Sequence, residues 1–216
     1  MDARARTSRR RGAEVREALI AAASEEFARA GYSGAQLKRI ARAAGTSESG
    51  LGRHFSSKEE LFTAAVLEPF LSLLDSYSAV FYQLLESPTA DRRFFEAFVE
   101  QSYDHIAEHR DSVQALIAAS GDPHAAAVIG VASERMSATF AQIHALTLTF
   151  HEHYGGFTTE HSRLWPGLLA GTIVALTTLE GFFLPQGSDR PDRSEVIDTI
   201  TEIWTRGIMG DRFESA

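Results

Sequence analysis

The stretch GTSESGLGRHFSSKEEL, residues 45–61, has the capping residues of one short helix followed directly by the start of a long one. Ser47 can accept a hydrogen bond from the free backbone N–H groups at the start of the short helix. Ser57 and Glu60 form an S-x-x-E capping box, which predicts that a fourth, longer helix begins there and covers residues 58–86.

The residues before this stretch predict two further helices. In VREALIAAASEEFARAG (15–31), apolar side chains recur at helical spacing, and Gly31 can supply the left-handed stop. In AQLKRIARAAG (35–45), the apolar positions follow the i, i+3, i+4, i+7 pattern, and Gly45 ends the helix after barely two turns. A long helix followed by two short ones with a glycine at the corner is helix-turn-helix geometry.

The rest of the chain also predicts helices. No stretch alternates convincingly with period two, and proline or glycine separates the apolar periodic segments. The sequence therefore predicts an all-α fold. The expected segments are 91–109, 111–120, 123–153, 161–184 and 192–209.

Composition and charge narrow the function. The chain of 216 residues has 44% hydrophobic residues and no cysteine, which fits a globular protein without disulfides or thiolate metal sites. Residues 1–62 hold twelve Lys or Arg against eight Asp or Glu, whereas the remainder is strongly acidic, and the whole chain carries a net charge of −8. A basic head on an acidic body suits a protein of which one end meets a polyanion.

Membrane and enzyme functions are disfavoured. The apolar run 18–23 is too short for a signal peptide, and the segment 164–184 is interrupted by Pro166, threonines and Glu180. We find neither a nucleophile elbow nor a phosphate-cradling glycine loop. We therefore expect a cytoplasmic protein that is not an enzyme, has no cofactor and does not enter a membrane.

The first 62 residues resemble the TetR family (TetR/AcrR type) of bacterial one-component transcriptional regulators. The resemblance covers residues 15–62 without a gap, and Phe27, Ile40, Leu51 and Phe55 are expected to form the small core of the three helices. The residues that carry it are Leu19, Ile20, Ala23, Phe27, Gly31, Tyr32, Ile40, Ala41, Ala44, Gly45, Ser47, Leu51, His54, Phe55, Lys58 and Leu61.

The resemblance implies a domain organisation of about nine helices. It implies a basic N-terminal arm over residues 1–12, with five arginines ahead of the first helix, and a helix-turn-helix DNA-binding domain over 13–60. A larger helical domain over 61–216 would bind a ligand and form the dimer.

The sequence departs from the family pattern in the predicted reading helix and before it. Ala35 replaces a hydroxyl residue that would cap the second helix, although Gln36 or Ser33 can serve in part. Gly52 replaces a tyrosine that, in the family, donates a hydrogen bond to a phosphate. Glu48 would repel the phosphates that it faces, unless it accepts from a cytosine N4 or pairs with Arg53. We expect an altered but functional reading head; the alternative is a dimer that has weakened or lost operator binding and acts as a protein-interaction or ligand-sequestering module.

The expected DNA-binding residues lie in the arm and in the second to fourth helices. Arg53 can make a bidentate contact to guanine, His54 and Lys58 match positions that meet phosphates, and the missing side chains of Gly50 and Gly52 would let the backbone approach the groove. The full set is Arg9, Arg10, Arg11, Gln36, Lys38, Thr46, Ser47, Glu48, Ser49, Gly50, Gly52, Arg53, His54 and Lys58.

The family resemblance implies a ligand pocket and a dimer interface in the remaining residues. Aromatic residues with a few polar groups could line a cavity for a small, mostly apolar effector. The expected lining is Phe70, Tyr77, Phe81, Phe98, Gln101, Tyr103, His105, Phe140, His144, Thr147 and Trp165. The last helices carry apolar faces that a homodimer would cover, and the expected interface is Leu168, Gly171, Thr172, Ala175, Leu179, Val196, Ile200, Ile203 and Trp204.

One set of histidines invites a metal interpretation: His144, His151, His153 and His161 with Glu152. A polar helix end accounts for it better, and we expect no metal. The sequence as a whole predicts a ligand-responsive regulator, most simply a repressor, that binds a palindromic double-stranded DNA operator as a homodimer and is released by its small-molecule effector.

Overall fold

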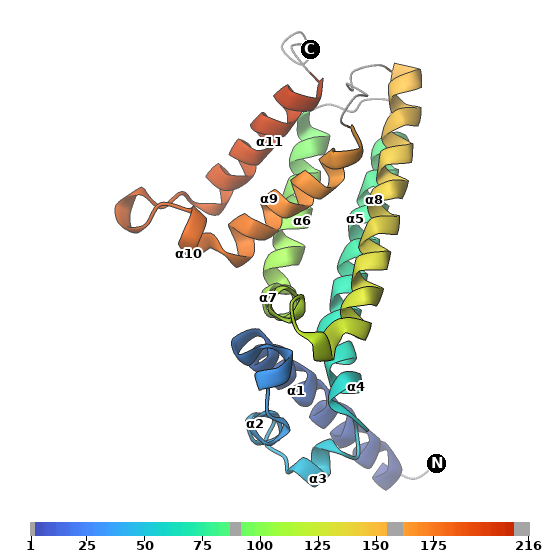
Figure 1. Cartoon of the computed structure of the whole chain (residues 1–216), viewed down its shortest axis with the longest axis vertical. Helices are drawn as coiled ribbons and strands as arrows, with labels where there is room; N and C mark the ends of the chain where they lie inside the picture. The colour runs from blue at the N-terminus through green and yellow to red at the C-terminus, as the bar shows by residue number, and fades with distance from the viewer. Residues whose placement is uncertain (1–2, 87–91, 155–161, 210–216) are drawn as a thin grey trace. The chain divides into compact units, whose positions relative to one another are not determined.

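The computed structural model describes residues 3–86, 92–154 and 162–209 and is helical with no strand in these ranges (Figure 1). The all-α prediction is confirmed. Within the same ranges, no single helix is both long and apolar enough to cross a membrane. Residues 110–119 and 123–149 pass such a test only as a pair, and they are bent by 114° at their break.

The chain forms two compact units, each made of two segments. The first comprises residues 1–71 and 111–133, and the second comprises residues 72–110 and 134–216. The first unit therefore contains the whole predicted helix-turn-helix segment together with helices from later in the chain.

The first unit contains α1, the short helices around the predicted turn, and parts of three longer helices. Its elements are α1 (Ala3–Gly34), α2 (Leu37–Ala43), α3 (Glu48–Leu51), α4 (Lys58–Phe62), the π-helix η1 (Thr63–Leu67), the first residues of α5 (Glu68–Glu86), most of α7 (Arg110–Ala119), the 3-10 turn η2 (Pro123–Ala125) and the start of α8 (Ala126–Tyr154). The four residues predicted as its core, Phe27, Ile40, Leu51 and Phe55, are all buried.

An aromatic cluster joins α1 to α4 in this unit. The rings of Phe27 and Phe62 meet edge to face at a centroid distance of 4.8 Å, and Tyr32 meets Phe62 in the same way at 5.0 Å. Such edge-to-face pairs are worth about 0.5–1.5 kcal/mol beyond the burial of their area. They fix α4 against α1 and so limit where the short helices between them can lie.

Helix α1 differs from the prediction at both ends. It begins at Ala3, so the arginines of residues 4–11 lie within its first turns instead of forming an arm ahead of it. Gly31 adopts the left-handed φ of +69° that was expected of a stop, and a further helical turn follows it up to Gly34. The basic residues extend the helix because nothing in their sequence breaks it: neither proline nor glycine occurs before Gly12.

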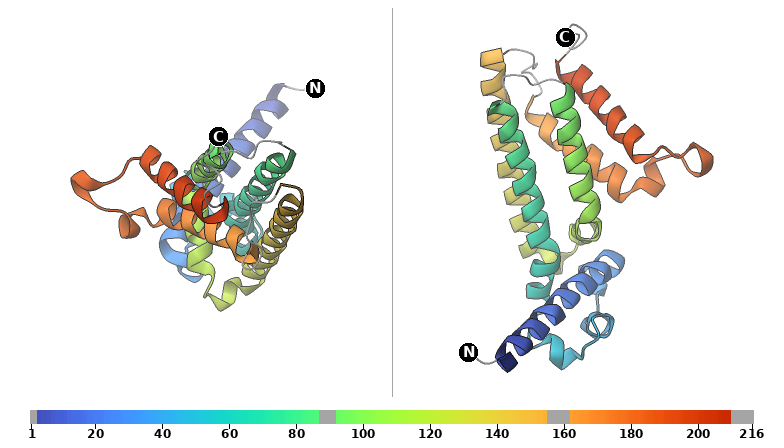
Figure 2. Two further views of the ribbon diagram at one scale, coloured as in Figure 1. Left: turned by 90° about the horizontal axis from the view of Figure 1, so that it is seen from above. Right: turned by 180° about the vertical axis from the view of Figure 1, so that it is seen from behind.

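In the second unit, α6 (Arg92–Glu108) lies at the centre. It packs against both α9 (Trp165–Thr178) and α11 (Arg193–Met209), as the views in Figure 2 show. The other elements are the rest of α5 and α8, the 3-10 turns η3 (Ser162–Leu164) and η4 (Gly187–Asp189), and the short helix α10 (Glu180–Phe183).

A buried aromatic contact and exposed ion pairs hold α6 in place. Phe98 of α6 is fully buried and meets the Tyr77 ring of α5 at 4.9 Å, and the Tyr77 hydroxyl donates to the carbonyl oxygen of Pro166 at 3.3 Å. Arg193 of α11 donates to both carboxylate oxygens of Asp104, at 2.8 and 2.6 Å, and to Glu100 at 3.0 Å.

The single helix predicted over 161–184 is wrong. The helix breaks at Leu179, where φ is −119° and ψ is 27°, and α10 begins one residue later. The Glu180 carboxylate is held there by Arg110 at 3.0 Å and by Arg190 at 2.7 Å. These two ion pairs fix the corner, a tertiary constraint that a continuous apolar pattern cannot reveal.

Candidate nucleic-acid interface and effector cleft

The corner between α2 and α3 has the geometry of a helix-turn-helix. Gly45 has a φ of +68°, a conformation that L side chains rarely adopt, and the N–H of Thr46 donates to the carbonyl of Ala41 at 2.9 Å. The Ser47 hydroxyl accepts from the N–H of Gly50 at 3.1 Å, so the predicted cap of α3 is confirmed.

The predicted capping box at the start of α4 is half formed. The Ser57 hydroxyl accepts from the N–H of Glu60 at 3.0 Å, as expected. The Glu60 carboxylate reaches one residue further back than a capping box requires. It accepts from the N–H and the hydroxyl of Ser56, both at 2.6 Å.

Helix α2 is capped from α1 and not by its own neighbours. Gln36, its N-cap residue, makes no side-chain cap. Instead, the Glu26 carboxylate accepts from the N–H of Gln36 at 3.2 Å and from the Arg29 guanidinium at 2.6 Å. The sequence suggested that Gln36 or Ser33 would partly replace the capping hydroxyl missing at Ala35. The Glu26 carboxylate caps the helix instead.

The Glu26 carboxylate stays ionised although it is buried. Its side chain is only 9% exposed. Burial raises the pKa of Glu26, but hydrogen bonds from Arg29 and the Gln36 N–H, with the charges of Arg29 and Arg39, outweigh that effect and hold the pKa below its usual value. A negative charge at the N-terminus of α2 also suits the helix dipole.

Seven of the fourteen predicted DNA-binding residues lie exposed in or beside α2 and α3. Those exposed are Gln36, Lys38, Ser47, Glu48, Ser49 and Arg53, together with Gly52, whereas Thr46 and His54 are half-buried. Arg39 and Arg42 of α2 are also exposed but were missed by the prediction, although the basic run KRIAR (38–42) was the visible signal.

The two glycines of the reading segment play different roles. Gly50 is buried, and a Cβ there would lie 2.2 Å from the Thr46 hydroxyl oxygen, so its lack of a side chain serves packing within the turn. The approach of the Gly50 backbone to DNA remains a prediction, and its packing role is a reason for this glycine that the sequence did not show. Gly52 is exposed, and a Cβ there would meet only the Glu48 carbonyl oxygen at an ordinary 3.5 Å and that of Ser49 at 3.9 Å.

Lys58 has partners other than the expected phosphate. Its ammonium donates to the carbonyl oxygens of Ala35 at 2.7 Å and Ser33 at 3.2 Å, and it lies 5.3 Å from the centroid of the Tyr32 ring. Partial burial lowers the pKa of Lys58, against the opposing effect of the Asp122 and Glu26 carboxylates. In this structure the side chain ties α4 to the end of α1.

Two sets of predictions fall outside what the structure describes. The side chains of Arg9, Arg10 and Arg11 are not among the described residues, and neither is that of Phe81. The predicted contacts of the arginines with DNA remain predictions. Of the histidine set considered for a metal, only the side chain of His144 is described.

A cleft of about 360 Å³ lies between α5 and α6 in the second unit. One wall is mostly apolar and the other is polar. Its lining is Leu73, Ser76, Tyr77 and Val80 of α5 with Gln101, Ser102, Asp104, His105 and Glu108 of α6. Of the predicted pocket residues, the cleft brings together Tyr77, Gln101 and His105.

The other predicted pocket residues with described side chains do not line this cleft. Phe70 belongs to the first unit, and Phe98 is core. The Thr147 hydroxyl donates to its own helix at Ile143, and Phe140 lies against Gly167. The remaining three, Tyr103, His144 and Trp165, are half-buried elsewhere.

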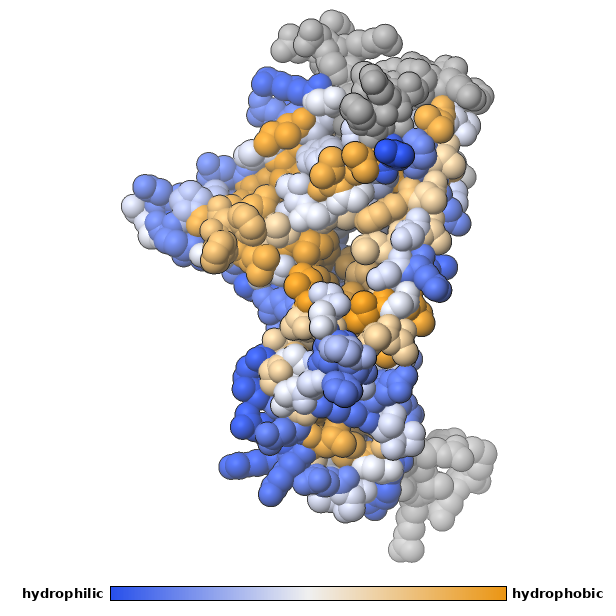
Figure 3. All heavy atoms as spheres, in the orientation of Figure 1, coloured by the Kyte–Doolittle hydropathy of each residue, from blue (hydrophilic) through white to orange (hydrophobic). Residues whose placement is uncertain are grey.

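A second, largely apolar groove of about 400 Å³ lies between α9 and α11. Five predicted interface residues line it: Thr172, Val196, Ile200, Ile203 and Trp204. Val196 and Ile200 are buried within the chain, so they form its floor. Of the other predicted residues, Leu168, Gly171 and Leu179 are exposed and Ala175 is half-buried. Figure 3 shows hydrophobic side chains gathered over α9 and α10, where Phe182 is 88% exposed.

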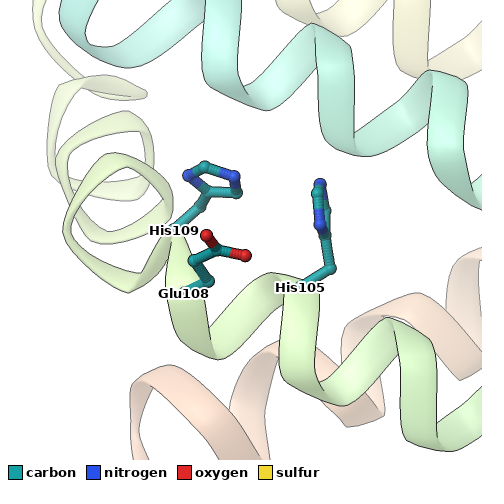
Figure 4. Close-up of side chains that lie close together, drawn as sticks. All are labelled: His105, Glu108 and His109. Atoms are coloured by element: carbon teal, nitrogen blue, oxygen red, sulfur yellow. The ribbon is translucent and has the colours of Figure 1, made fainter.

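The end of α6 carries a cluster that the sequence interpretation overlooked. His105, Glu108 and His109 each offer a ligand atom, and these atoms lie within 4.8 Å of one another (Figure 4). Burial and the neighbouring His105 lower the pKa of His109. The available signal was the spacing HIAEH (105–109), which places both imidazoles on one helical face.

Comparison with known proteins agrees with the geometry of the first unit. The family model for bacterial regulatory proteins of the tetR family matches residues 19–65, the segment that holds the turn. Residues 19–65 are a TetR-type segment. It is 36% identical over 124 residues to the HTH-type transcriptional activator FasR of Mycolicibacterium smegmatis. The match covers 56% of this chain and 54% of FasR, about half the length of each.

Solved TetR-type structures share the fold over most of the chain. A TetR-like transcriptional regulator from Rhodococcus sp. RHA1 superposes with a TM-score of 0.64 at 18% identity and covers 89% of this chain and 94% of its own. The regulator FadR from Bacillus subtilis, in complex with stearoyl-CoA, gives a TM-score of 0.59 at 12% identity, with coverages of 90% and 98%. At these identities the likeness concerns the fold alone.

The substitution Glu26→Gln tests the cap of α2. Because the folded chain lowers the pKa of Glu26, the ionised carboxylate adds stability above its usual pKa of 4.5, and that stability is lost as the pH falls through the lowered value. We expect Glu26→Gln to lower the free energy of unfolding at pH 7 by about 1–2 kcal/mol, with the difference from wild type shrinking in acid. Urea unfolding followed by circular dichroism at several pH values measures this.

Glu25→Gln is the matched control, because Glu25 is the exposed neighbour of Glu26 on the same helix. It should change stability by less than about 0.5 kcal/mol. Equal effects of the two substitutions would show that the buried carboxylate has no special role.

Proposed function

We propose that the chain is a ligand-responsive transcriptional regulator that binds a palindromic DNA operator as a homodimer. The observation that carries this proposal is the exposed face of α2 and α3, built on a capped and fully packed helix-turn-helix. Side chains of this face can donate to phosphates and read base edges in the major groove. A cytoplasmic location, with access to the chromosome, belongs to the same proposal.

The reading face supports moderate and not maximal affinity. Lys38, Arg39 and Arg42 supply positive charge along α2. The exposed Glu48 carboxylate in the first turn of α3 opposes DNA binding by its negative charge, and Gly52 contributes no side chain to it. Each lost neutral hydrogen bond costs roughly 0.5–1.5 kcal/mol. Because Glu48 and Gly52 contribute little to binding, the preference for particular bases would depend strongly on Arg53.

The cleft between α5 and α6 is the proposed effector site. Leu73, Tyr77 and Val80 offer an apolar wall, while Gln101 and His105 offer polar groups that can orient a ligand. We propose a small, mostly apolar effector with a polar end. The stearoyl-CoA of the Bacillus subtilis regulator has this character, which makes acyl compounds the first class to test.

A homodimer would cover the apolar groove between α9 and α11. Exposed apolar side chains such as Leu168, Ile203 and Phe182 favour such an interface. A two-fold dimer presents two reading helices and so favours a palindromic site. Repression is the outcome that the family resemblance implies, although the relative from Mycolicibacterium smegmatis is named an activator. A reporter gene behind the operator would separate the two.

Selection of bound duplexes from a random DNA library tests the proposal. The purified, dimeric protein should enrich a palindrome at about 0.15 M salt, near physiological ionic strength. The selection should be repeated with acyl compounds present, because a corepressor-type regulator needs its ligand. Failure to enrich any site in either case would favour the alternative, a protein-interaction or ligand-sequestering dimer.

Arg53→Ala should weaken binding to the enriched duplex by about 1–3 kcal/mol and relax the preference at one base pair in each half-site. Arg53 is exposed just after α3, where a guanidinium can reach guanine. Fluorescence anisotropy with single-base duplex variants measures both effects. Arg92→Ala, at an exposed arginine of the second unit, is the control. An unchanged base preference would remove Arg53 from the reading set.

Gly52→Tyr should strengthen DNA binding, because the side chain fits at this exposed position and its hydroxyl can donate to a phosphate. Gly52→Ala is the control: it removes the conformational freedom of glycine, worth up to about 1 kcal/mol in a helix, without adding a donor. The comparison of the two affinities isolates the tyrosine. If Tyr and Ala bind DNA equally well, the end of α3 does not approach the backbone.

A further inference from the structure

The C-terminal end of α6 brings together two imidazoles and a carboxylate. His105 and His109 are four residues apart, so they project from one face of the helix, and their ring centroids are 4.8 Å apart. Figure 4 shows the Glu108 carboxylate beside them on the same side of α6. One ligand atom from each residue lies within 4.8 Å of the other two.

One imidazole nitrogen of this cluster lacks a hydrogen-bond partner that its burial requires. The Nε2 atom of His105 is buried and has no hydrogen-bond partner. A buried polar atom in this state costs roughly 1–3 kcal/mol, and such exceptions call for a specific explanation. A metal ion bound to Nε2 would satisfy the atom.

The position in the helix favours a cation. The N–H of His109 donates to the carbonyl oxygen of His105 at 3.2 Å, so the cluster occupies the last turn of α6. The C-terminal turn of a helix carries a partial negative charge that attracts cations. The nearby Asp104 is already held by Arg193, which leaves Glu108 as the carboxylate for the ion.

The donor set and its spacing fit zinc. Zinc binds imidazole nitrogen and carboxylate oxygen at about 2.0–2.2 Å, which places tetrahedral ligands roughly 3.3–3.5 Å apart. From 4.8 Å, the ligand atoms therefore need to close by up to about 1.4 Å, a change that side-chain rotation provides. The order H-x-x-E-H on a helix also binds zinc through its two histidines in a class of peptidases.

We propose that His105, Glu108 and His109 form a site for a divalent transition metal ion, with Zn²⁺ as the ion that fits best. Three protein ligands leave a fourth coordination position open. Because His105 and Glu108 also line the cleft between α5 and α6, the bound ion would lie beside that cleft. The inference concerns the metal alone and does not require that the chain bind DNA.

The test is a competition titration of Zn²⁺ between the full-length protein, freed of any polyhistidine tag, and a chromophoric chelator. The wild type should bind one ion per chain. His105→Gln, Glu108→Gln and His109→Gln should each weaken binding at least tenfold, because each removes one ligand. His124→Gln is the matched control, since His124 is exposed and lies in the first unit.

Two further measurements keep the proposal falsifiable. Zn²⁺ should raise the thermal midpoint of the wild type but not that of Glu108→Gln, an exposed position whose substitution leaves the fold intact. A variant with His151, His153 and His161 all changed to Gln should bind Zn²⁺ as the wild type does. Loss of binding in that variant, or unchanged binding in the three α6 variants, would overturn the proposal.

Discussion

The buried Glu26 carboxylate is the contact on which the reading head depends. It lies on α1, yet it caps the first free N–H of α2 and is itself neutralised by Arg29. Without this acceptor, the start of α2 would keep a polar group unpaired beside the buried Ala35. Since α3 follows α2 through a four-residue corner, the direction of α2 fixes where the exposed residues of α3 point.

The short helices are held by packing as well as by caps. Isolated helices of four to seven residues are not stable in water, because the free energy of their few hydrogen bonds does not offset the cost of nucleation. Here Ile40 and Leu51 are buried, and the Lys58 ammonium of α4 donates to the carbonyl oxygens of Ser33 and Ala35. A lysine used in this way supports the reading face indirectly, by fixing the frame on which it lies.

Sequence patterns predicted what depends on local spacing and missed what depends on tertiary contact. The Ser47 cap, the left-handed glycines and the core of Phe27, Ile40, Leu51 and Phe55 follow from neighbouring residues. The Glu26 cap joins residues ten apart in the chain. The break at Leu179 depends on the ion pairs of Glu180 with Arg110 and Arg190, and neither feature leaves a periodic signal. The cluster at the end of α6 was predictable from the i, i+4 spacing of His105 and His109. The metal interpretation considered instead the histidines of residues 144–161.

The central claim is that this altered helix-turn-helix still reads DNA by sequence. Its most direct test is the affinity of the purified protein for its enriched duplex and for a scrambled duplex of the same composition, measured from low to high salt. A reader should lose affinity for both duplexes as salt rises, because counterion release supports the phosphate contacts, while its preference for the enriched duplex persists. Equal affinity for the two duplexes at every salt concentration would contradict the account.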